Sequence, residues 1–462
     1  MTSQRNHLRN GFAGVCAALF QLGICVAQTP EYLASEEPIP STLEETRSAT
    51  EGIGIGQDSR GFERMLQRRR YLPELRERIP RTGEPFFDDA VYHIAPRAYY
   101  RYRDDGDGSI SEAFAAGGEF GVETGYLGEI LRFGFTGYTS QDIYGPSDRA
   151  GSGLLEPVQE SYTVLGEAYA DIKTDWGHAT LYRQRLDIPY LNASDVRMTP
   201  NTFEAYGIHS TAIPNLAASI GHVQRIKFRN STDFEHLSEH AGSKGSERGV
   251  TVAGARYEFT DKTFVGLIGE YGWDTFHTTY FEAEHYRKIT DDLSLKTGLQ
   301  FTDQRSVGDE LLGRFDAQHL GYKLSIGYQN FILTSAFTWT SGDHGIRKPW
   351  GGSPSYNSVI ISDFDRAGER AFRTGISYDF SELGLEGVAV SASWLYGNTP
   401  DSGSDASPDQ QEFNVNLDYR PSLRGLDNFW LRLRYASNDS DAALGGSDRQ
   451  DLRMILNYSI SF

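Results

Sequence analysis

The feature that most constrains this chain is an alternation of apolar and polar residues with a period of two, from about residue 91 to the C-terminus. It is clearest in the last segment, where one face carries Leu452, Met454, Leu456, Tyr458, Ile460 and Phe462. The residues between them are polar apart from Ile455. Because successive side chains of a strand point to opposite faces, this pattern predicts strands with one apolar and one polar face.

The same pattern recurs along the chain, bounded by turn residues. It predicts strands at 91–103, 112–126, 129–140, 160–172, 177–184, 202–211, 215–227, 249–259, 262–272, 275–288, 292–303, 314–326, 331–340, 368–379, 386–397, 411–419, 427–437 and 450–462. These are 18 segments, an even number, as a closed barrel with both termini on one side requires.

The connections alternate between short and long, which distinguishes this chain from a soluble β-sandwich. With the first strand running outward, the predicted periplasmic turns are short: Leu127-Gly128, Thr260-Asp261 and 290–292. The predicted external loops are mostly longer: 141–159, 185–201, 228–248, 341–367 and 398–410. The predicted fold is therefore all-β, a transmembrane antiparallel up-and-down β-barrel.

Composition agrees with a barrel. The mean hydropathy is −0.48, and after the N-terminal segment no apolar run is long enough for a membrane-spanning helix. Barrel strands have only one apolar face, so their average hydropathy resembles that of soluble proteins. A net charge of −19 argues against a nucleic-acid partner, because binding phosphates requires a basic surface.

Residues 1–27 are typical of a secretory signal peptide, with basic residues, an apolar run and a cleavage site after Ala27. A membrane anchor is the alternative, but the run is short for one. A lipoprotein signal at Cys25 is disfavoured by Ile24, which stands where a small residue is needed. Cys16 and Cys25 both lie in this segment, so the mature chain is expected to hold no disulfide and no cysteine-based metal site.

Residues 28–84 form a predicted periplasmic extension, acidic and disordered up to about residue 58. The arginine-rich stretch 60–81 predicts a short amphipathic helix with Met65, Leu66, Tyr71 and Leu72. We expect it to contact lipid headgroups or the barrel rim; a plug or a partner-binding element is the alternative. The barrel domain is predicted to span 85–462.

Several blocks of sequence resemble the OprD-type porins. The clearest are Leu-Asp-Ile-Pro-Tyr-Leu-Asn at 186–192, Asp195, and Arg-Met-Thr-Pro-Asn-Thr-Phe-Glu at 197–204. Further blocks follow the family order at 96–101, 231–234, 327–329, 341–343 and 377–380, with Gly384. The resemblance covers 85–462, and the long N-terminal extension departs from it. It implies a substrate-selective porin in the outer membrane of a Gram-negative bacterium, with loops 185–201 and 341–367 folded inward as a constriction.

Strand parity predicts which cations face the lumen. A cation on the lipid face costs roughly 2–4 kcal/mol at mid-membrane, so basic residues opposite an apolar face are expected to point inward. This selects Arg97, Arg101, Arg225, Lys227, Arg373, Arg432, Arg434 and Arg453. The resemblance implies that such residues form a basic ladder for carboxylates; pairing with lumenal Asp and Glu is the alternative. Parity with Leu181 places Arg183 and Arg185 outward, at the rim or at the start of loop 185–201.

The two inward loops carry charges of both signs. Residues predicted to line the constriction are Asp187, Asn192, Asp195, Arg197, Asp343, His344, Arg347 and Lys348. Opposed charges across a narrow pore create a transverse field that orients zwitterions. Loop hinges and external decoration are the alternative roles.

The predicted function is passive, selective diffusion of small anionic or zwitterionic solutes such as amino acids or organic acids, without a cofactor. Expected partners are outer-membrane lipid, lipopolysaccharide and, through the terminal Phe462, the barrel-assembly machinery. A plugged or adhesive barrel is the first alternative.

A barrel hydrolase is the least favoured alternative, since the chain has neither a G-x-S-x-G nor an H-E-x-x-H motif. His236–His240 matches an H-x-x-E-H pattern but falls in a predicted external loop. The Asp-Gly-Asp-Gly segment at 105–108 resembles part of a calcium loop, yet Arg103 and Phe114 stand where carboxylate ligands are needed. We expect no metal at either place.

Overall fold

The structure is a computed structural model that describes residues 70–400, 406–421, 426, 428–441 and 445–462. The predicted signal peptide and most of the predicted extension, including Met65 and Leu66, lie outside the described residues. So does part of the predicted loop 398–410.

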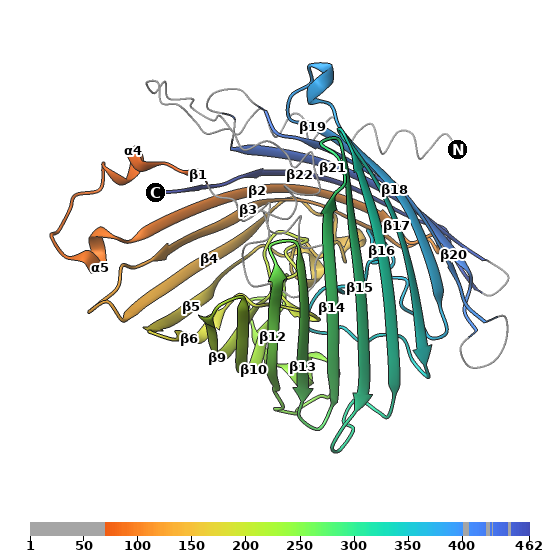
Figure 1. Cartoon of the computed structure of the whole chain (residues 1–462), viewed down its shortest axis with the longest axis horizontal. Helices are drawn as coiled ribbons and strands as arrows, with labels where there is room; N and C mark the ends of the chain where they lie inside the picture. The colour runs from red at the N-terminus through yellow and green to blue at the C-terminus, as the bar shows by residue number, and fades with distance from the viewer. Residues whose placement is uncertain (1–69, 401–405, 422–425, 427, 442–444) are drawn as a thin grey trace.

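Long antiparallel strands form the wall of the molecule (Figure 1). They are β2 (Val91–Asp104), β3 (Ile110–Glu123), β4 (Leu131–Tyr144), β5 (Tyr162–Thr174), β6 (Gly177–Gln184), β9 (Thr202–Ile213), β10 (Leu216–Lys227), β12 (Val250–Thr260), β13 (Thr263–Gly272), β14 (Phe276–Lys288), β15 (Leu293–Ser306), β16 (Asp316–Tyr328), β17 (Phe331–Gly342), β18 (Arg370–Asp379), β19 (Val388–Asn398), β20 (Gln410–Tyr419), β21 (Phe429–Ser440) and β22 (Arg449–Tyr458).

Each of these strands pairs with its neighbour in sequence, and β2 pairs with β22, with Arg101 opposite Arg453. The sheet therefore closes into an antiparallel barrel of 18 strands. The short strands β1 (Arg70–Tyr71), β11 (Phe234–His236) and β23 (Ile460–Ser461) add to it. Closure leaves no edge along the wall, as a sheet within a lipid bilayer requires.

The sequence alternation is confirmed in the burial of the strands. In β15, Leu299 and Phe301 are exposed on the outside, whereas Gln300, Thr302 and Gln304 are buried inside. The apolar face points to lipid and the polar face to the lumen. No helix among the described residues is long and apolar enough to cross a membrane.

All 18 predicted strands are present, and their ends differ in places. The predicted turn Leu127-Gly128 is longer, because β3 ends at Glu123 and β4 begins at Leu131. The helix α5 (Pro85–Asp88) lies against this turn, where Gly125 donates its N–H to the carbonyl of Phe86 (2.9 Å). The two sides of the turn remain joined by backbone bonds between Thr124 and Phe133 and between Leu127 and Leu131.

The described part of the extension begins as a strand. β1 pairs in parallel with β23, and the N–H of Leu72 donates to the carbonyl of Ser461 (2.7 Å). The one-turn helix α4 (Pro73–Arg76) follows. Tyr71 was predicted to lie in a helix but is in a strand. The cause is that the last residues of the chain extend beyond β21 and pair with Tyr71 through their backbone. Figure 1 shows α4 and α5 at the same end of the barrel as the C-terminus.

The outward placement of Arg185 is wrong. Its guanidinium donates to the Tyr138 hydroxyl (2.9 Å) and to Glu167 (3.1 Å) on the inner wall, and it also pairs with Glu119. In β6 the backbone of Tyr182 has a φ of 85°, which breaks the regular alternation just before this residue. Inward and outward faces that are assigned by counting from Leu181 are therefore wrong for Arg185, which follows this irregularity.

The seam between the first and last strands holds two arginines face to face. Arg101 and Arg453 are direct neighbours in register, and both bind Asp451, at 2.7 Å each. The side chains are almost fully buried in the lumen, so Asp451 is the carboxylate that lets two like charges meet at the seam. Removing one charge of such a buried group leaves the others uncompensated.

We expect Asp451→Asn to lower the free energy of unfolding of the barrel by about 3–5 kcal/mol, because it leaves two buried guanidinium groups without their carboxylate. Urea unfolding in detergent or lipid measures the change. Asp105→Asn is the control, since its pair with Arg103 is partly exposed and such pairs contribute about 0–1 kcal/mol. Equal effects of the two substitutions would contradict this role of Asp451.

Candidate functional site: a constriction inside the barrel

The loop between β17 and β18 (343–369) lies within the barrel and bonds to its inner wall at several points. Gln300 donates to the carbonyl of Pro354 (2.7 Å), and His319 is 2.9 Å from the Ser355 hydroxyl. The Glu412 carboxylate accepts the N–H groups of Ile361 and Ser362, both at 2.9 Å. These contacts come from β15, β16 and β20, so the loop crosses the lumen rather than covering the outside.

Loop 185–201 also folds inward. Tyr190 is 2% exposed, its hydroxyl is 2.8 Å from that of Thr302, and its ring meets Tyr280 edge to face. At the end of the loop, Lys227 donates to the carbonyl of Pro200 (3.0 Å). Arg97 binds both carboxylate oxygens of Asp195, at 2.6 and 3.1 Å.

A third loop, 145–161, folds inward too, which the sequence analysis did not predict. Leu154 and Leu155 are fully buried in a cluster with Tyr99 and Met198. The Ser140 hydroxyl donates to the carbonyl of Leu154 (2.7 Å). The signal for this was two adjacent leucines in an otherwise polar loop.

Loops 185–201, 228–248 and 343–369 and the wall enclose a cavity of about 800 Å³. Its cationic lining residues are Arg197, Arg229, Lys348, Arg373, Arg432, Arg434 and Arg453. Among the described residues that line it, Asp363 is the one carboxylate. Hydroxyls and amides also line it, among them Ser353, Ser355, Tyr356, Ser358, Ser393, Asn414 and Asn416. Apolar side chains such as Phe228, Val359 and Ile360 belong to the lining too. The charged part of the lining is therefore strongly cationic.

Half of the predicted ladder lines this cavity: Arg373, Arg432, Arg434 and Arg453. On the inner wall Arg432 pairs with Asp418 (2.6 Å) and Arg453 with Asp451. The guanidinium of Arg434 donates to the Asn416 amide oxygen (2.7 Å), and that of Arg373 to the carbonyl of Tyr356 (3.0 Å).

The other predicted ladder residues lie elsewhere. Arg97 lines a separate small pocket of about 30 Å³ with Asp195, and Arg101 is buried at the seam. Lys227 is buried against the two loop carbonyls it binds. Arg225 is nearly half-exposed, beside Glu204 and His236, and does not line the cavity. A register shift between Val223 and Arg225 changes the alternation there.

Of the residues predicted for the constriction in loop 185–201, Arg197 lines the cavity. Asp195 is held by Arg97, and Asp187 lies in the short strand β7 (Asp187–Ile188), paired with β8 (Leu191–Asn192). Asn192 is buried between the loops and bonds to Gly352.

Of those predicted in the second loop, Lys348 lines the cavity and pairs with Asp363 (3.0 Å) and Asp365. Arg347 donates to the carbonyl of Leu312 (2.7 Å) and lies over the Phe315 ring. Asp343 and His344 are about half-exposed and bond to each other (2.8 Å). The structure therefore does not bring these last two residues to the cavity.

Sequence reasoning missed Arg229 and Asp363, which line the cavity from two loops. Neither stands in an alternating strand, so parity gave no information about them. The position of Arg229, two residues after the end of β10, could have indicated it. Residues that directly follow a strand lie at the end of the barrel wall, where they can reach the lumen.

Burial and like charges shape the loop groups of the cavity. Burial, with Arg101, Arg453 and Arg229 nearby, holds the pKa of Arg197 well below its usual range. Burial also raises the pKa of Asp365 to about 6, opposed by Lys348 and reinforced by Asp363. Asp363 itself has a lowered pKa: burial raises it, but Lys348, the hydrogen bond from Ser358 and the nearby Arg229 together outweigh burial.

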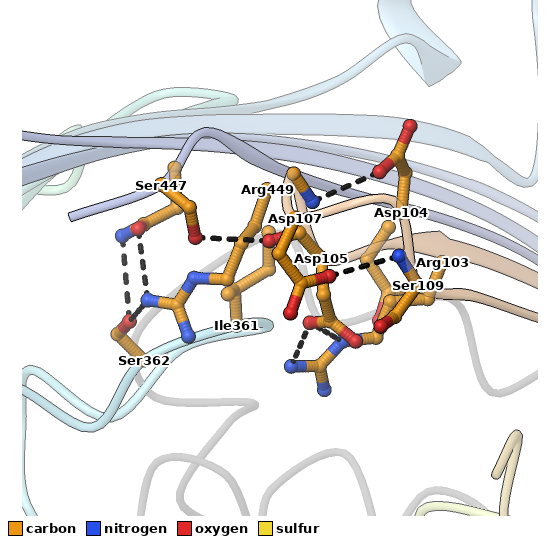
Figure 2. A network of polar contacts seen from close by, with 12 residues as sticks. Arg103, Asp104, Asp105, Asp107, Ser109, Ile361, Ser362, Ser447 and Arg449 are labelled. Atoms are coloured by element: carbon orange, nitrogen blue, oxygen red, sulfur yellow. Dashed lines mark hydrogen bonds and ion pairs between the residues drawn. The ribbon is translucent and has the colours of Figure 1, made fainter. Parts of the chain in front are cut away.

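The two motifs that suggested metals are used in other ways. His236 contacts Arg225, and His240 contacts Glu235 (3.2 Å). Figure 2 shows the segment 104–109, where Asp104 accepts the N–H of Gly106 and Asp107 that of Ser109. Among the described residues no group of three or more His, Cys, Asp or Glu is arranged to hold a metal ion.

Figure 2 also shows that the carbonyl of Asp105 accepts a hydrogen bond from Ser447 (2.9 Å). Beside it, Arg449 donates to the Ser362 hydroxyl (2.9 Å), which ties the second constriction loop to the wall. The aspartates of this external turn thus serve its own hydrogen bonds.

A closed barrel with loops folded into a polar lumen defines an outer-membrane porin. The sequence profile of the outer membrane porin, OprD family, matches residues 84–462. The chain therefore belongs to the OprD family of outer-membrane porins, whose members are channels and not enzymes.

Individual relatives are distant in sequence. Porin D of Pseudomonas aeruginosa is 22% identical over 415 residues, 81% of this chain and 92% of that protein. Two solved structures from Pseudomonas aeruginosa are similar: OccK9 (OpdG), 25% identical with a TM-score of 0.75, and OpdK with vanillate, 24% identical with 0.74. A BenF-like porin from Pseudomonas fluorescens is 18% identical with 0.75. Each covers 82% of this chain and 100% of its own.

The group around Lys348 predicts a pH effect. With a pKa of about 6, Asp365 is charged at about pH 7 and neutral at about pH 5. Its protonation removes a negative charge beside the cavity, so anion permeability relative to cation permeability is expected to rise as the pH falls. Reversal potentials in a KCl gradient measure this ratio.

Asp365→Asn is the control, because it fixes that position in the neutral form. It should show the high anion preference at both pH values. A pH effect that persists in Asp365→Asn would assign it to another group.

Proposed function

We propose that this porin conducts small carboxylates and related anions through the cavity of about 800 Å³. The observation that carries this proposal is the charge of the lining, in which seven cationic side chains accompany Asp363. A solute that leaves water for such a cavity loses part of its hydration. Only for an anion do the cationic side chains compensate this loss with charge-assisted hydrogen bonds.

The arrangement of the carboxylates supports the same proposal. Asp418 and Asp451 sit against Arg432 and Arg453 on the inner wall, and Lys348 lies between two aspartates. Among the described residues, no carboxylate lies within ion-pair distance of Arg197, and its guanidinium donates to the carbonyl of Val196 (2.9 Å). The planar guanidinium fork matches a carboxylate in two parallel hydrogen bonds.

Hydroxyl and amide groups on the lining supply the neutral polar contacts that a small organic acid needs beyond its carboxylate. OpdK, whose fold is similar, was solved with vanillate, an aromatic carboxylate. Amino acids and organic acids are therefore the solute classes that we propose for this chain, guided by the four ladder residues that line the cavity and by loops 185–201 and 343–369.

Export and assembly belong to the same proposal. We expect cleavage after Ala27, and insertion by the barrel-assembly machinery through Phe462. The ring of Phe462 stacks on Tyr92 at 5.5 Å, and the backbones of these residues are hydrogen-bonded. Outer-membrane lipid and lipopolysaccharide would then surround the apolar outer face.

Single-channel conductance with added small carboxylates tests the transport proposal. We expect transient block of the current by carboxylates in the wild-type protein. In Arg434→Gln the affinity for block should fall about tenfold or more, because a hydrogen bond to a charged group contributes about 1.5–3 kcal/mol. Arg434 is the suitable position, since its bond to Asn416 is with a neutral amide.

Arg225→Gln is the matched control, because Arg225 has the same charge, belongs to the same predicted ladder and lies outside the cavity. Its substitution should leave the block unchanged. Equal loss in both variants would indicate a long-range effect of net charge, and no loss in either would remove the cavity from the selectivity mechanism.

A further inference from the structure

Asn192 of loop 185–201 is hydrogen-bonded directly to loop 343–369. Its side chain forms a two-way contact with the backbone of Gly352: Oδ1 accepts the N–H (2.9 Å) and Nδ2 donates to the carbonyl (3.1 Å). Its own N–H donates to the carbonyl of Trp350 (3.3 Å). We call these three hydrogen bonds the loop clasp.

Every polar group of Asn192 has a partner, within the clasp or beside it. Nδ2 also contacts the carbonyl of Ile188 (3.3 Å), and the carbonyl of Asn192 accepts from Asn201 (3.2 Å). The residue is 3% exposed, so water does not replace these partners. An amide is the side chain that offers both a donor and an acceptor to one peptide group. Aspartate would place an oxygen against the Gly352 carbonyl.

The approach of the two loops is close. A Cβ added to Gly351 would lie 2.7 Å from the backbone nitrogen of Asn192, which is too near for any real contact. A Cβ added to the neighbouring Gly352 would meet nothing nearer than 3.6 Å, an ordinary contact distance. The sequence Gly351-Gly352 thus permits the contact at the first position and tolerates a methyl group at the second.

Both sides of the clasp lead to the cavity. On one side follow Ser194 and Arg197, and on the other Lys348, Gly351 and Gly352, all of which line it. Trp350 anchors the second side, with its ring stacked on Phe276 at 5.0 Å and its Nε1 bonded to the carbonyl of Leu237 (2.8 Å). A change in the distance between the loops would therefore change the opening between their lining groups.

We propose that Asn192 is a positioning residue that sets the width of the channel by joining the two constriction loops into one unit. It acts through the loops and does not line the cavity itself. This inference does not depend on which solute passes, because it concerns the opening available to any ion.

The test is single-channel recording in KCl without any carboxylate. Asn192→Ala removes the side-chain half of the clasp, and Gly351→Ala forces the loops apart without removing a hydrogen-bonding group. Both should raise the mean conductance about twofold and add rapid current fluctuations, because ion flow follows the pore opening and a released loop moves. Heat-modifiable gel mobility checks that each barrel is folded.

Gly269→Ala is the control: it adds the same methyl group to a residue of β13 that does not line the cavity. The added Cβ would meet nothing nearer than 3.9 Å, so the conductance should equal that of the wild-type protein. If Asn192→Ala does not fold, the comparison of Gly351→Ala with the glycine control still tests the proposal. Wild-type conductance and noise in Asn192→Ala and Gly351→Ala would overturn the proposal, since the wall contacts alone would then hold the loops. Equal changes in both glycine variants would also overturn it.

Discussion

The rest of the structure depends on closure of the sheet, in which β2 hydrogen-bonds to β22. In lipid every backbone group of the wall must be paired, so a sheet can cross only as a closed barrel. Eighteen strands close around a lumen that their own side chains do not fill. The long loops 185–201 and 343–369 fold into that space, and the cavity is lined by cations from these loops, such as Arg197 and Lys348, together with cations from the wall, such as Arg434.

Closure also determines how charge is distributed in the lumen. It makes the first and last strands neighbours, which brings Arg101 and Arg453 face to face around Asp451. Such buried pairs neutralise one another and hold the seam. The cations that remain for a solute are then those whose contacts are with neutral groups, such as Arg197 with the Val196 carbonyl. A count of arginines in the lumen overestimates the ladder, because part of it serves the wall.

The sequence predicted the strands far better than the site, for a physical reason. A strand between lipid and water needs an apolar residue at every second position. β15 and β22 can therefore be recognised from the alternation of apolar and polar residues alone. Parity failed where the backbone is irregular, at Tyr182 with its positive φ. A single residue out of step reverses every later assignment of faces in that strand.

The loops carry no such repeat. Nothing periodic distinguishes Lys348, which reaches the cavity, from Asp343, which stays partly exposed outside it. Their positions follow from individual contacts, such as the stacking of Trp350 on Phe276 and the bond from Gln300 to Pro354. Because those contacts are made by loops on a wall that is already satisfied, loop substitutions can alter the cavity while the barrel keeps its hydrogen bonds. Distant relatives can therefore share this fold at 18–25% identity and still differ in the charges that they present to a solute.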